Sequence, residues 1–581
     1  MRTLLKNAYI VTMDPNKGVY THGSLVVNGD RIEGVYSGMA PIAEYDEVID
    51  CDGKIVMPGF VNTHVHTSQQ LGRGLGDDVN LLTWLHDRIW PYESSMTEED
   101  SYISTLLCCV EQIKAGCTMF AEPGGQFVSG MARAVTEAGV RAKLANSIMD
   151  CGEGLPANWV HSTDEEIART VEDIRNFHNT ANGRVQVWFG LRTIFNNSDE
   201  LILRSKEEAD KYGVGVHMHV AEVRDEVEYL KEKIGVQTVT HLNDLGVLDK
   251  NFLAVHTVWL TNDEVEMFRD HQVKVSHNPA AAMRVLGFAK VPRMLREGIC
   301  VTIGTDGAPS NNRMDIVDEM WLTSLIHKGW RLEPDVVKAQ EVLAMVTLKG
   351  AVALMEEKNC GSLTEGKKAD LIVINPRSAG MLPLHDTVAN LVTSMHSDNV
   401  ESTMCDGRWL MRERKLLTLD EQAIYTEAQR AADAGETVAA VVEQGVDQGA
   451  VRVAGGRMDH QARGLVDHDD VVVLIDHVQG DVLGGQGRLA ELGNVHGDRL
   501  TAGEAGAFGG GLAVDTDAAL GDQAGGLGTG QRAVGGEEGV QADAGVFSCG
   551  CQLPRHGQAP FSACRICRRT TGSTPRPAGR R

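Results

Sequence analysis

Short apolar runs alternate with amphipathic segments between residues 55 and 310, and this alternation constrains the fold more than any other feature of the chain. Apolar runs of strand length set between helical periodicities are typical of β/α units that build a buried parallel sheet. The predicted strands are residues 55–66, 117–124, 140–150, 185–193, 214–222, 252–260, 273–280 and 300–309. Eight such units predict an α/β fold, a distorted (β/α)8 barrel of the TIM type.

The segments between these strands have the pattern of outer helices. Thr97 and Asp100 open the segment 97–116 with the spacing of a capping box. Residues 164–177 and 224–235 place apolar side chains three and four positions apart, as the buried face of a helix requires.

Both flanks of the predicted barrel alternate apolar and polar residues between turn signals, which predicts strands. We therefore expect one small β-sandwich domain assembled from the two flanks, with residues 311–357 as closing helices. The predicted organisation is a sandwich from residues 1–56 and 358–420, a hydrolase barrel at 57–357, a terminal helix at 421–437 and a low-complexity tail at 438–581.

The predicted tail differs in composition from the rest of the chain. Lysine does not occur after Lys415, and glycine rises to about one residue in five, well above its average share. Such a segment buries too little apolar surface to offset its chain entropy, so we expect disorder there. Its composition also fits GC-rich DNA translated in an unselected frame, which suggests a frameshift or a fusion. The tail also contains a CxC and a CxxC pair, formed by Cys549, Cys551, Cys564 and Cys567. These four cysteines could form a Cys₄ zinc site, or their spacing could be a coincidence.

The net charge limits the partners of the chain. With 55 Lys and Arg against 80 Asp and Glu, the formal charge is −25, which disfavours nucleic acid and anionic membranes. No run of about 18 apolar residues suggests a membrane span. The first residues do not resemble a secretory signal, and the cysteines from Cys51 to Cys405 show no disulfide-like rhythm, so a cytoplasmic location is expected.

Histidines occur at the ends of predicted strands. His64 and His66 end the first barrel strand two residues apart, so both side chains are expected to point into the barrel mouth. An HxH pair alone is a weak signal, because strand-end histidines are often merely polar. His219, however, lies at the end of the fifth strand, Glu222 begins the loop that follows it, and His256 ends the sixth strand.

Asp306, in a Gly-Thr-Asp-Gly turn, completes this set after the eighth strand. Active sites of barrels occupy this rim, and burying so many ionisable groups is costly without a metal or a partner. Three imidazoles and a carboxylate suit one Zn²⁺, or alternatively Fe, Co or Mn, with a position left for water whose pKa the metal lowers. Glu222 and Asp306 could then carry protons, while His256 could orient the water.

The segments PGFVNTHVHT, HMHVAE, VHTVWL, VSHNPA and GTDGAPSNN, in this order, resemble the amidohydrolase superfamily over about residues 1–430. Within it the chain is similar to the clade of S-adenosylhomocysteine and methylthioadenosine deaminases and of atrazine chlorohydrolase and related herbicide hydrolases. The resemblance implies a distorted barrel with a small β-sandwich and one metal. It implies His64, His66, His219 and Asp306 as ligands, and Glu222, His256 and Asp306 as catalytic groups.

The resemblance also implies substrate-binding residues. Trp84 and Glu93 correspond to a tryptophan and a glutamate that bind the nucleoside in the deaminases, although a packed amphipathic helix would explain them equally well. His277 and Asn278 match the HNP element and would frame the pocket or stabilise a turn. Arg192 stands where the deaminases have a substrate-binding histidine.

Polar residues that often follow the HNP element are also replaced, here by Ala281 and Ala282. The leading prediction is deamination of an N-heteroaromatic or related small molecule by a metal-activated water. Two alternatives stay open: a herbicide-type hydrolase that cleaves a C–Cl bond or a carbamate, thiocarbamate or urea, and a non-catalytic binding protein. A homo-oligomer is neither indicated nor excluded.

Overall fold

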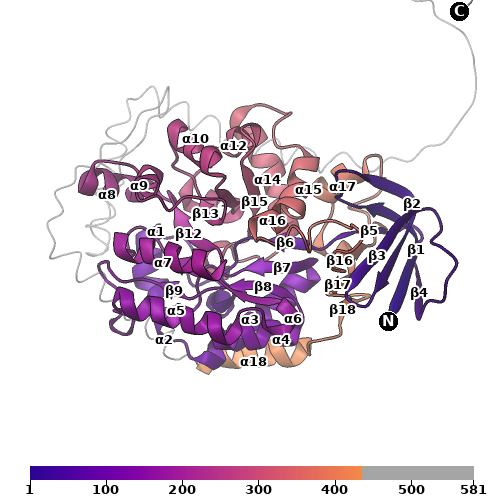
Figure 1. The fold of residues 1–581 in the computed structure, drawn as a ribbon, viewed down its shortest axis with the longest axis horizontal. Helices are drawn as coiled ribbons and strands as arrows, with labels where there is room; N and C mark the ends of the chain where they lie inside the picture. The colour runs from indigo at the N-terminus through magenta and orange to yellow at the C-terminus, as the bar shows by residue number, and fades with distance from the viewer. Residues whose placement is uncertain (435–581) are drawn as a thin grey trace, which may run out of the picture. The chain divides into compact units, whose positions relative to one another are not determined.

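The computed structural model of the chain describes residues 1–434. Residues 435–581 lie outside the described residues, and with them lie the predicted tail and its four cysteines. Within the described part, a barrel of parallel strands and outer helices carries a second, mostly antiparallel sheet at one side, in which only β1 pairs in parallel, with β4 and β5 (Figure 1). No helix of this part is both long and apolar enough to cross a bilayer.

The lateral sheet is built from both flanks of the barrel, as predicted. Its nine strands have the order β19-β18-β17-β16-β5-β1-β2-β3, with β4 paired to β1. They are β1 (Arg2–Val11), β2 (Val19–Asn28), β3 (Arg31–Ser37), β4 (Glu47–Asp50), β5 (Ile55–Pro58), β16 (Leu371–Ile374), β17 (Val400–Cys405), β18 (Arg408–Arg412) and β19 (Lys415–Leu416). The two flanks meet where β16 pairs antiparallel with β5.

Two parallel sheets form the barrel wall, in the orders β10-β8-β7-β6 and β15-β14-β13-β12-β11-β9. The strands are β6 (Phe60–Asn62), β7 (Cys117–Ala121), β8 (Arg141–Leu144), β9 (Ser147–Ile148), β10 (Val185–Val187), β11 (Phe189–Leu191), β12 (Val216–Val220), β13 (Phe252–His256), β14 (Lys274–His277) and β15 (Cys300–Ile303). β8 and β9 are the two halves of one interrupted strand, and so are β10 and β11. The ten short strands therefore fill the eight strand positions of the barrel. The wall closes where Thr63 N donates to Ile303 O at 3.1 Å.

The first predicted strand divides into two strands that belong to different sheets. β5 pairs with β1 and β16, whereas β6 pairs with β7. The change of sheet occurs at Gly59, where a Cβ would lie 2.3 Å from side-chain atoms of Thr118. Only glycine allows this close approach, which local periodicity does not reveal.

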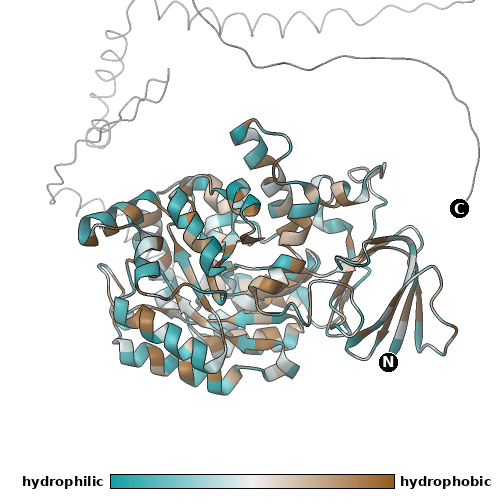
Figure 2. Ribbon diagram, turned by 45° about the horizontal axis from the view of Figure 1, so that its top comes forward, coloured by the Kyte–Doolittle hydropathy of each residue, from teal (hydrophilic) through white to brown (hydrophobic). Residues whose placement is uncertain are grey.

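Helices cover the outside of the barrel. The longer ones are α3 (Glu98–Lys114), α4 (Val128–Ala138), α5 (Thr163–Phe177), α7 (Asp199–Tyr212), α8 (Arg224–Ile234), α10 (Asn262–His271), α14 (Ile316–Arg331) and α18 (Glu421–Ala434). The capping box predicted at Thr97 and Asp100 is present, and the two segments with helical spacing are α5 and α8. Figure 2 shows hydrophilic and hydrophobic residues on each outer helix, as expected for helices with one buried face.

Shorter helices complete the structure, and several of them lie near the barrel mouth. They are η1 (Thr67–Gly72), α1 (Leu81–Thr83), η2 (Trp84–Ile89), α2 (Trp90–Ser95), η3 (Ala157–Trp159), α6 (Thr180–Gly183), α9 (Thr238–Asp244), α11 (Pro279–Ala281), η4 (Ala282–Leu286), α12 (Val291–Arg296), α13 (Ala308–Asn311), α15 (Ala339–Met345), α16 (Leu348–Ala353), α17 (Thr387–Thr393) and η5 (Ser397–Asn399). α14, α15 and α16 are the closing helices predicted at 311–357.

A buried ion-pair cluster connects the barrel to the lateral sheet. Arg141 on β8 binds Asp370 through Nε at 2.6 Å and Asp406 through Nη2 at 2.7 Å. All three side chains are less than a tenth exposed. Because a buried charge without its partner is costly, this cluster fixes the junction of the two parts.

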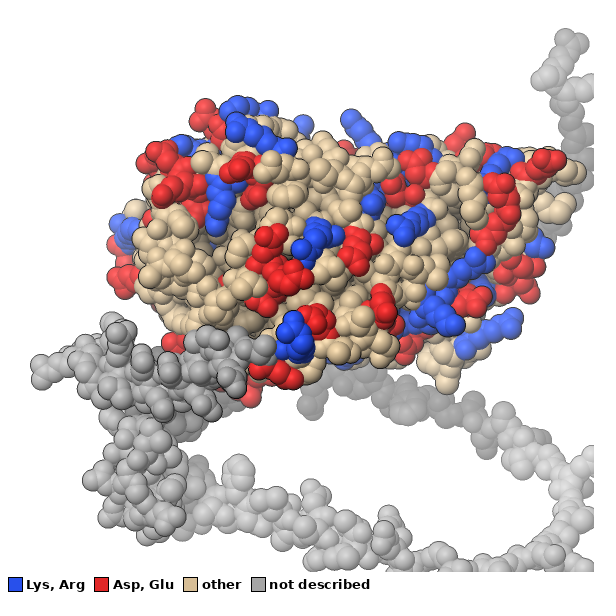
Figure 3. All heavy atoms as spheres, turned by 90° about the horizontal axis from the view of Figure 1, so that it is seen from below, with Lys and Arg blue, Asp and Glu red and all other residues tan. Residues whose placement is uncertain are grey.

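The outer surface carries charges of both signs. On the face shown in Figure 3, acidic and basic side chains are interspersed among uncharged residues. Ion pairs such as Arg204 with Asp164 and Arg224 with Glu228 contribute to the outer surface. Exposed pairs of this kind stabilise a fold little, so the packed core carries most of the stability.

Candidate metal-centred active site

Four histidines and one aspartate meet at the carboxyl ends of the barrel strands. His219 lies on β12, His256 is the last residue of β13, and Asp306 follows β15. β6 ends at Asn62, so the prediction that His64 and His66 end this strand was wrong. Val65 N still donates to Ala121 O at 2.9 Å, which keeps the chain alongside β7, and the two rings lie 5.0 Å apart.

Backbone strain is concentrated in the turns that carry these groups. Ala221, His256 and Asp306 have φ values of 48°, 65° and 65°, in the left-handed region that residues other than glycine rarely adopt. Such conformations persist only where the surrounding structure enforces them, and they cluster at functional sites. Gly304 permits the last turn, because a Cβ there would lie 2.7 Å from the Cβ of His64.

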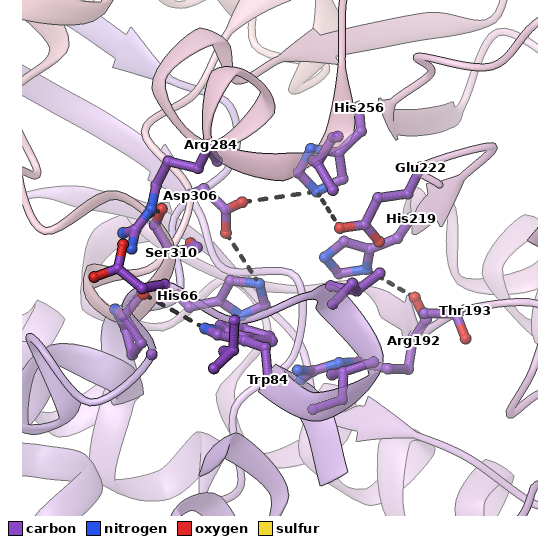
Figure 4. A pocket seen from close by; sticks show the side chains of 18 residues that line it. His66, Trp84, Arg192, Thr193, His219, Glu222, His256, Arg284, Asp306 and Ser310 are labelled. Carbon is purple, nitrogen blue, oxygen red and sulfur yellow. Dashed lines mark hydrogen bonds and ion pairs between the residues drawn. The ribbon is translucent and has the colours of Figure 1, made fainter. Parts of the chain in front are cut away.

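The side chains converge closely enough to share one ion. One nitrogen of each of His64, His66 and His219 lies within 4.8 Å of the others, and the same holds for the donor atoms of His64, His256 and Asp306. Asp306 Oδ1 lies 3.5 Å from His64 Nε2 and 3.7 Å from His66 Nε2. Figure 4 shows His66, His219, His256 and Asp306 arranged around the centre of a cavity.

Each of the three predicted ligand imidazoles directs its Nδ1 toward an outer partner. His64 Nδ1 lies 3.1 Å from His217 Nε2, and His219 Nδ1 lies 2.7 Å from the carbonyl oxygen of Arg192. His66 Nδ1 faces Glu122 Oε1 at 3.7 Å, which is too long for a hydrogen bond, so this third contact is only an ion-pair approach. Metal-ligating histidines have this arrangement, because the outer partner fixes the tautomer and leaves Nε2 free for the ion.

The site therefore fits a metal ion. His64 Nε2 is buried and has no hydrogen-bond partner among the described residues, although it points toward Asp306. A buried polar atom without a partner is costly, and coordination would satisfy it. Nitrogen donors with one carboxylate are a set typical of zinc and other borderline divalent ions. The cluster is a histidine-rich metal site.

Burial sets the charge state of these groups. It lowers the pKa of His66 and His219 well below the usual value, and the nearby His64 adds to this effect, so both are neutral as ligands must be. Burial alone would raise the pKa of Asp306, but the adjacent His64 and the other imidazoles around the carboxylate bring it well below its usual range.

Glu222 and His256 face the proposed metal position from the same side. His256 Nε2 lies 3.5 Å from Glu222 Oε1 and 3.7 Å from Asp306 Oδ2. Burial, followed by the charge of Asp306, raises the pKa of Glu222 to about 8. A carboxyl group that holds its proton near neutral pH is suited to donate it to a substrate.

The cavity in front of these groups has a volume of about 320 Å³. Its lining residues are His66, Gly76, Asp78, Val79, Leu81, Trp84, Leu85, Arg192, Thr193, His219, Glu222, His256, Ala281, Arg284, Leu286, Asp306, Pro309 and Ser310. A largely pre-formed, partly apolar cavity with a few converging polar groups is the usual form of a small-molecule site.

The predicted substrate-binding residues divide into two groups. Trp84 and Arg192 line the cavity. Glu93 is buried beneath it, where it accepts a hydrogen bond from Gln69 Nε2 at 2.6 Å and lies 3.3 Å from Arg192 Nη1. Arg192 thus pairs with Glu93 instead of facing the cavity as an isolated charge, a contact that depends on tertiary structure alone.

His277 and Asn278 lie behind His256, and the residues that line the cavity in the described part of the chain include neither. Asn278 Nδ2 lies 3.2 Å from His256 Nδ1, and His277 Nε2 lies 3.3 Å from His327 Nε2. The structure therefore places Asn278 where it can hold the His256 ring, so that His256 Nε2 faces the cavity.

Sequence reasoning missed three buried groups that hold the site. His217 supports His64, Glu122 accepts hydrogen bonds from Thr67 N and Oγ1, and Glu226 accepts them from the backbone of Ala221 and Glu222. His217 precedes His219 by two residues in a second HxH pair, a signal that alternation along a strand could have used.

Comparisons with known proteins show which proteins the chain is similar to. The profile of the amidohydrolase family matches residues 55–410. A 5′-deoxyadenosine deaminase from Methanobrevibacter smithii is 38% identical over 430 residues, which cover 74% of this chain and 97% of that protein. A 5-methylthioadenosine/S-adenosylhomocysteine deaminase from Syntrophomonas wolfei is 36% identical over 435 residues, with 74% and 99% covered.

Solved structures share the fold. An adenosine deaminase from Xanthomonas campestris with bound zinc superposes with a TM-score of 0.70 at 26% identity, covering 75% of this chain and 98% of that one. An atrazine chlorohydrolase from Arthrobacter aurescens, complexed with zinc, reaches 0.69 at 21% identity, with 74% and 100% covered.

Proposed function

The chain belongs to the amidohydrolase family, and we propose that it removes the 6-amino group of a 5′-substituted adenosine as ammonia. It is a metal-dependent hydrolase that acts on C–N bonds. The observation that carries the proposal is the convergence of three imidazoles and Asp306 beside Glu222, in a cavity that Trp84 also lines. We further propose one zinc ion, held by His64, His66, His219 and Asp306.

The residues of the site divide the reaction between them. A divalent ion at this position would lower the pKa of a water molecule and make it nucleophilic near neutral pH. Asp306 would accept a proton from the attacking water, and His256, whose Nε2 lies 3.7 Å from Asp306 Oδ2, would orient that water. Glu222 would donate its proton to the ring nitrogen, take up the proton of the added hydroxyl and pass it to the departing amine, and then recover its own proton from Asp306, so that both carboxyl groups return to their starting states. Water adds to the carbon that carried nitrogen, and the products are a 6-oxo ring and ammonia.

The cavity wall supports an aromatic substrate. Leu81, Trp84 and Leu286 line it, and the Trp84 indole donates to Pro309 O at 3.4 Å, which fixes the ring plane. A flat heterocycle can stack or pack edge-on against such a wall. Arg192 offers its guanidinium group to the substrate, and because Glu93 pairs with it below the wall, its charge is not left unpaired.

A triazine chlorohydrolase is the second candidate, because Ala281 gives the cavity wall an apolar surface where polar groups would favour a nucleoside. Both reactions need the same activated water, so only the substrate distinguishes them. We include a chlorotriazine in the test for this reason.

The test is a substrate panel on the zinc-loaded chain. We expect at least one of 5′-deoxyadenosine, 5-methylthioadenosine and S-adenosylhomocysteine to be deaminated. Each molecule of 6-oxo product should be accompanied by one molecule of ammonia. Glu222→Gln should lower kcat by about 10²- to 10⁴-fold with zinc still bound. Glu228→Gln, which alters an exposed residue of the following helix, is the matched control. Chloride release without ammonia would favour the second candidate, and no release with zinc bound would exclude both.

A further inference from the structure

The cavity has three zones. The lining comprises the catalytic groups, apolar side chains such as Leu81 and Leu286, and charged residues of the rim. The rim carries charges: Asp78 and Arg284 line it, and Asp77 pairs with Arg284. Figure 4 shows Arg284 and Ser310 across the cavity from Glu222 and His219. The proposed reaction accounts for the first two zones but gives no role to the charged rim.

Hydrogen bonds hold the rim groups in place. Arg284 Nη2 binds Asp77 Oδ1, and Arg284 Nη1 donates to the carbonyl oxygen of Ser310 at 3.0 Å. Asn312 Nδ2 donates to Asp77 Oδ1 at 2.8 Å. The side chains of Arg284 and Asp77 remain 28% and 43% exposed, so a ligand at the rim can reach both.

The two sides of the rim come from unusual backbone. Arg284 lies in η4, a π-helical turn, and the opposite side continues into η2, another π-helical turn that contributes Trp84 and Leu85 to the cavity. Turns of this type are rare and occur frequently at functional sites. Both sides of the cavity mouth therefore have a local structure suited to ligand contact.

We propose that Arg284 and Asp77, with Asp78, form a subsite for a zwitterionic amino-acid group on the 5′ substituent of the nucleoside. This inference rests on the proposed function. The 6-amino group and the 5′ carbon lie at opposite ends of adenosine, so a substrate whose ring reaches Glu222 extends its 5′ substituent toward the rim. The carboxylate of the substituent meets Arg284, and its ammonium group meets Asp77 or Asp78.

Exchange of partners makes this recognition favourable. A partly exposed ion pair such as Arg284 with Asp77 contributes little stability, so separating it costs little. A zwitterionic substituent replaces the ion pair between Arg284 and Asp77 with two new ion pairs, one to Arg284 and one to an aspartate. These new pairs lie closer to the low-dielectric cavity, where charge-assisted hydrogen bonds are stronger. A methyl or methylthio substituent makes no such exchange. The subsite therefore favours S-adenosylhomocysteine over 5′-deoxyadenosine.

The experiment compares kcat/KM for S-adenosylhomocysteine, 5-methylthioadenosine and 5′-deoxyadenosine on the zinc-loaded full chain. Arg284→Met, which keeps the length of the side chain, should lower the ratio of S-adenosylhomocysteine to 5′-deoxyadenosine about tenfold, mainly through KM. Arg284→Lys should retain part of the ratio, and Asp77→Asn should lower it. Arg204→Met, which breaks an exposed pair outside the cavity, is the control. High salt should lower the same ratio in the unaltered chain.

The outcomes separate the two proposals. An unaltered ratio in Arg284→Met, or equal losses on all three nucleosides, would overturn the subsite while leaving the deaminase intact. The first result would mean that the rim does not contact the substituent, and the second that Arg284 only holds the loop. Failure of the unaltered chain to release ammonia from every nucleoside would overturn the proposed function and the subsite with it.

Discussion

Removal of the Glu226 carboxylate should slow the reaction without removing the metal. Glu226 on α8 is 1% exposed, and its two oxygens accept hydrogen bonds from Ala221 N at 2.8 Å and Glu222 N at 2.9 Å. These bonds hold a turn whose φ at Ala221 is 48°, a strained value for this residue. Glu226 is thus a positioning residue for Glu222.

The size of the effect follows from these two bonds. A hydrogen bond to a charged group contributes about 1.5–3 kcal/mol, so Glu226→Leu loses roughly 3 kcal/mol or more of turn stability. Burial raises the pKa of Glu226 to about 7, so part of the population is neutral at that pH and the lower figure applies. If the turn must be held for catalysis, about 3 kcal/mol corresponds to roughly 100-fold in kcat.

The assay measures kcat, KM, metal content and melting temperature for Glu226→Leu, Glu226→Gln and the control Glu228→Gln. The control alters an exposed side chain of the same helix and should behave as the unaltered chain does. Glu226→Gln keeps one acceptor oxygen and should be intermediate. The reasoning is refuted if Glu226→Leu keeps kcat within about twofold, or if its lost activity merely follows lost metal or lost fold.

Three further predictions concern other buried groups. His217→Phe removes the outer partner of His64 and should weaken metal affinity about 10- to 100-fold, measured by competition with a chelator; unchanged affinity would contradict the role. Burial raises the pKa of Glu319 to about 8, above its unfolded value, so its contribution to stability is full below about pH 4.3 and is lost as the pH rises through about 8. Glu319→Gln should therefore reduce the decline in the free energy of unfolding, measured with urea, between pH 5 and 8. If the variant declines as steeply as the unaltered chain, the prediction is wrong. Asp370→Ala leaves Arg141 with one buried partner fewer and should cost about 3 kcal/mol or more of unfolding free energy, whereas a loss below about 1 kcal/mol would show that the junction does not depend on it.

The barrel and the order of its metal-binding segments could be predicted from the sequence. Buried parallel strands read as continuous apolar runs, and the chemistry of a barrel lies where those runs end. His219, His256 and Asp306 therefore marked the site before any contact was known. The resemblance to the amidohydrolase superfamily, carried by the same motifs, is confirmed by the family match at residues 55–410.

Contacts between distant segments could not be predicted in this way. The pairing of Arg192 with Glu93 depends on how α2 packs under the strand ends, and no local periodicity encodes it. The division of residues 55–66 into two strands depends on the close approach of Gly59 to Thr118. Alternation along a strand gives the face of a side chain, whereas the register between strands decides which partner it meets.

The most direct test of the metal site is X-ray absorption spectroscopy at the metal edge of the purified full chain, with metal content determined on the same sample. The account predicts one zinc ion per chain, with nitrogen neighbours at about 2.0–2.1 Å, a carboxylate oxygen at a similar distance, and loss of the ion in His66→Ala. Sulfur neighbours at about 2.3 Å would instead place the ion on cysteines, as in the pairs Cys549 with Cys551 and Cys564 with Cys567. That result, or a chain that binds no metal, would contradict the account.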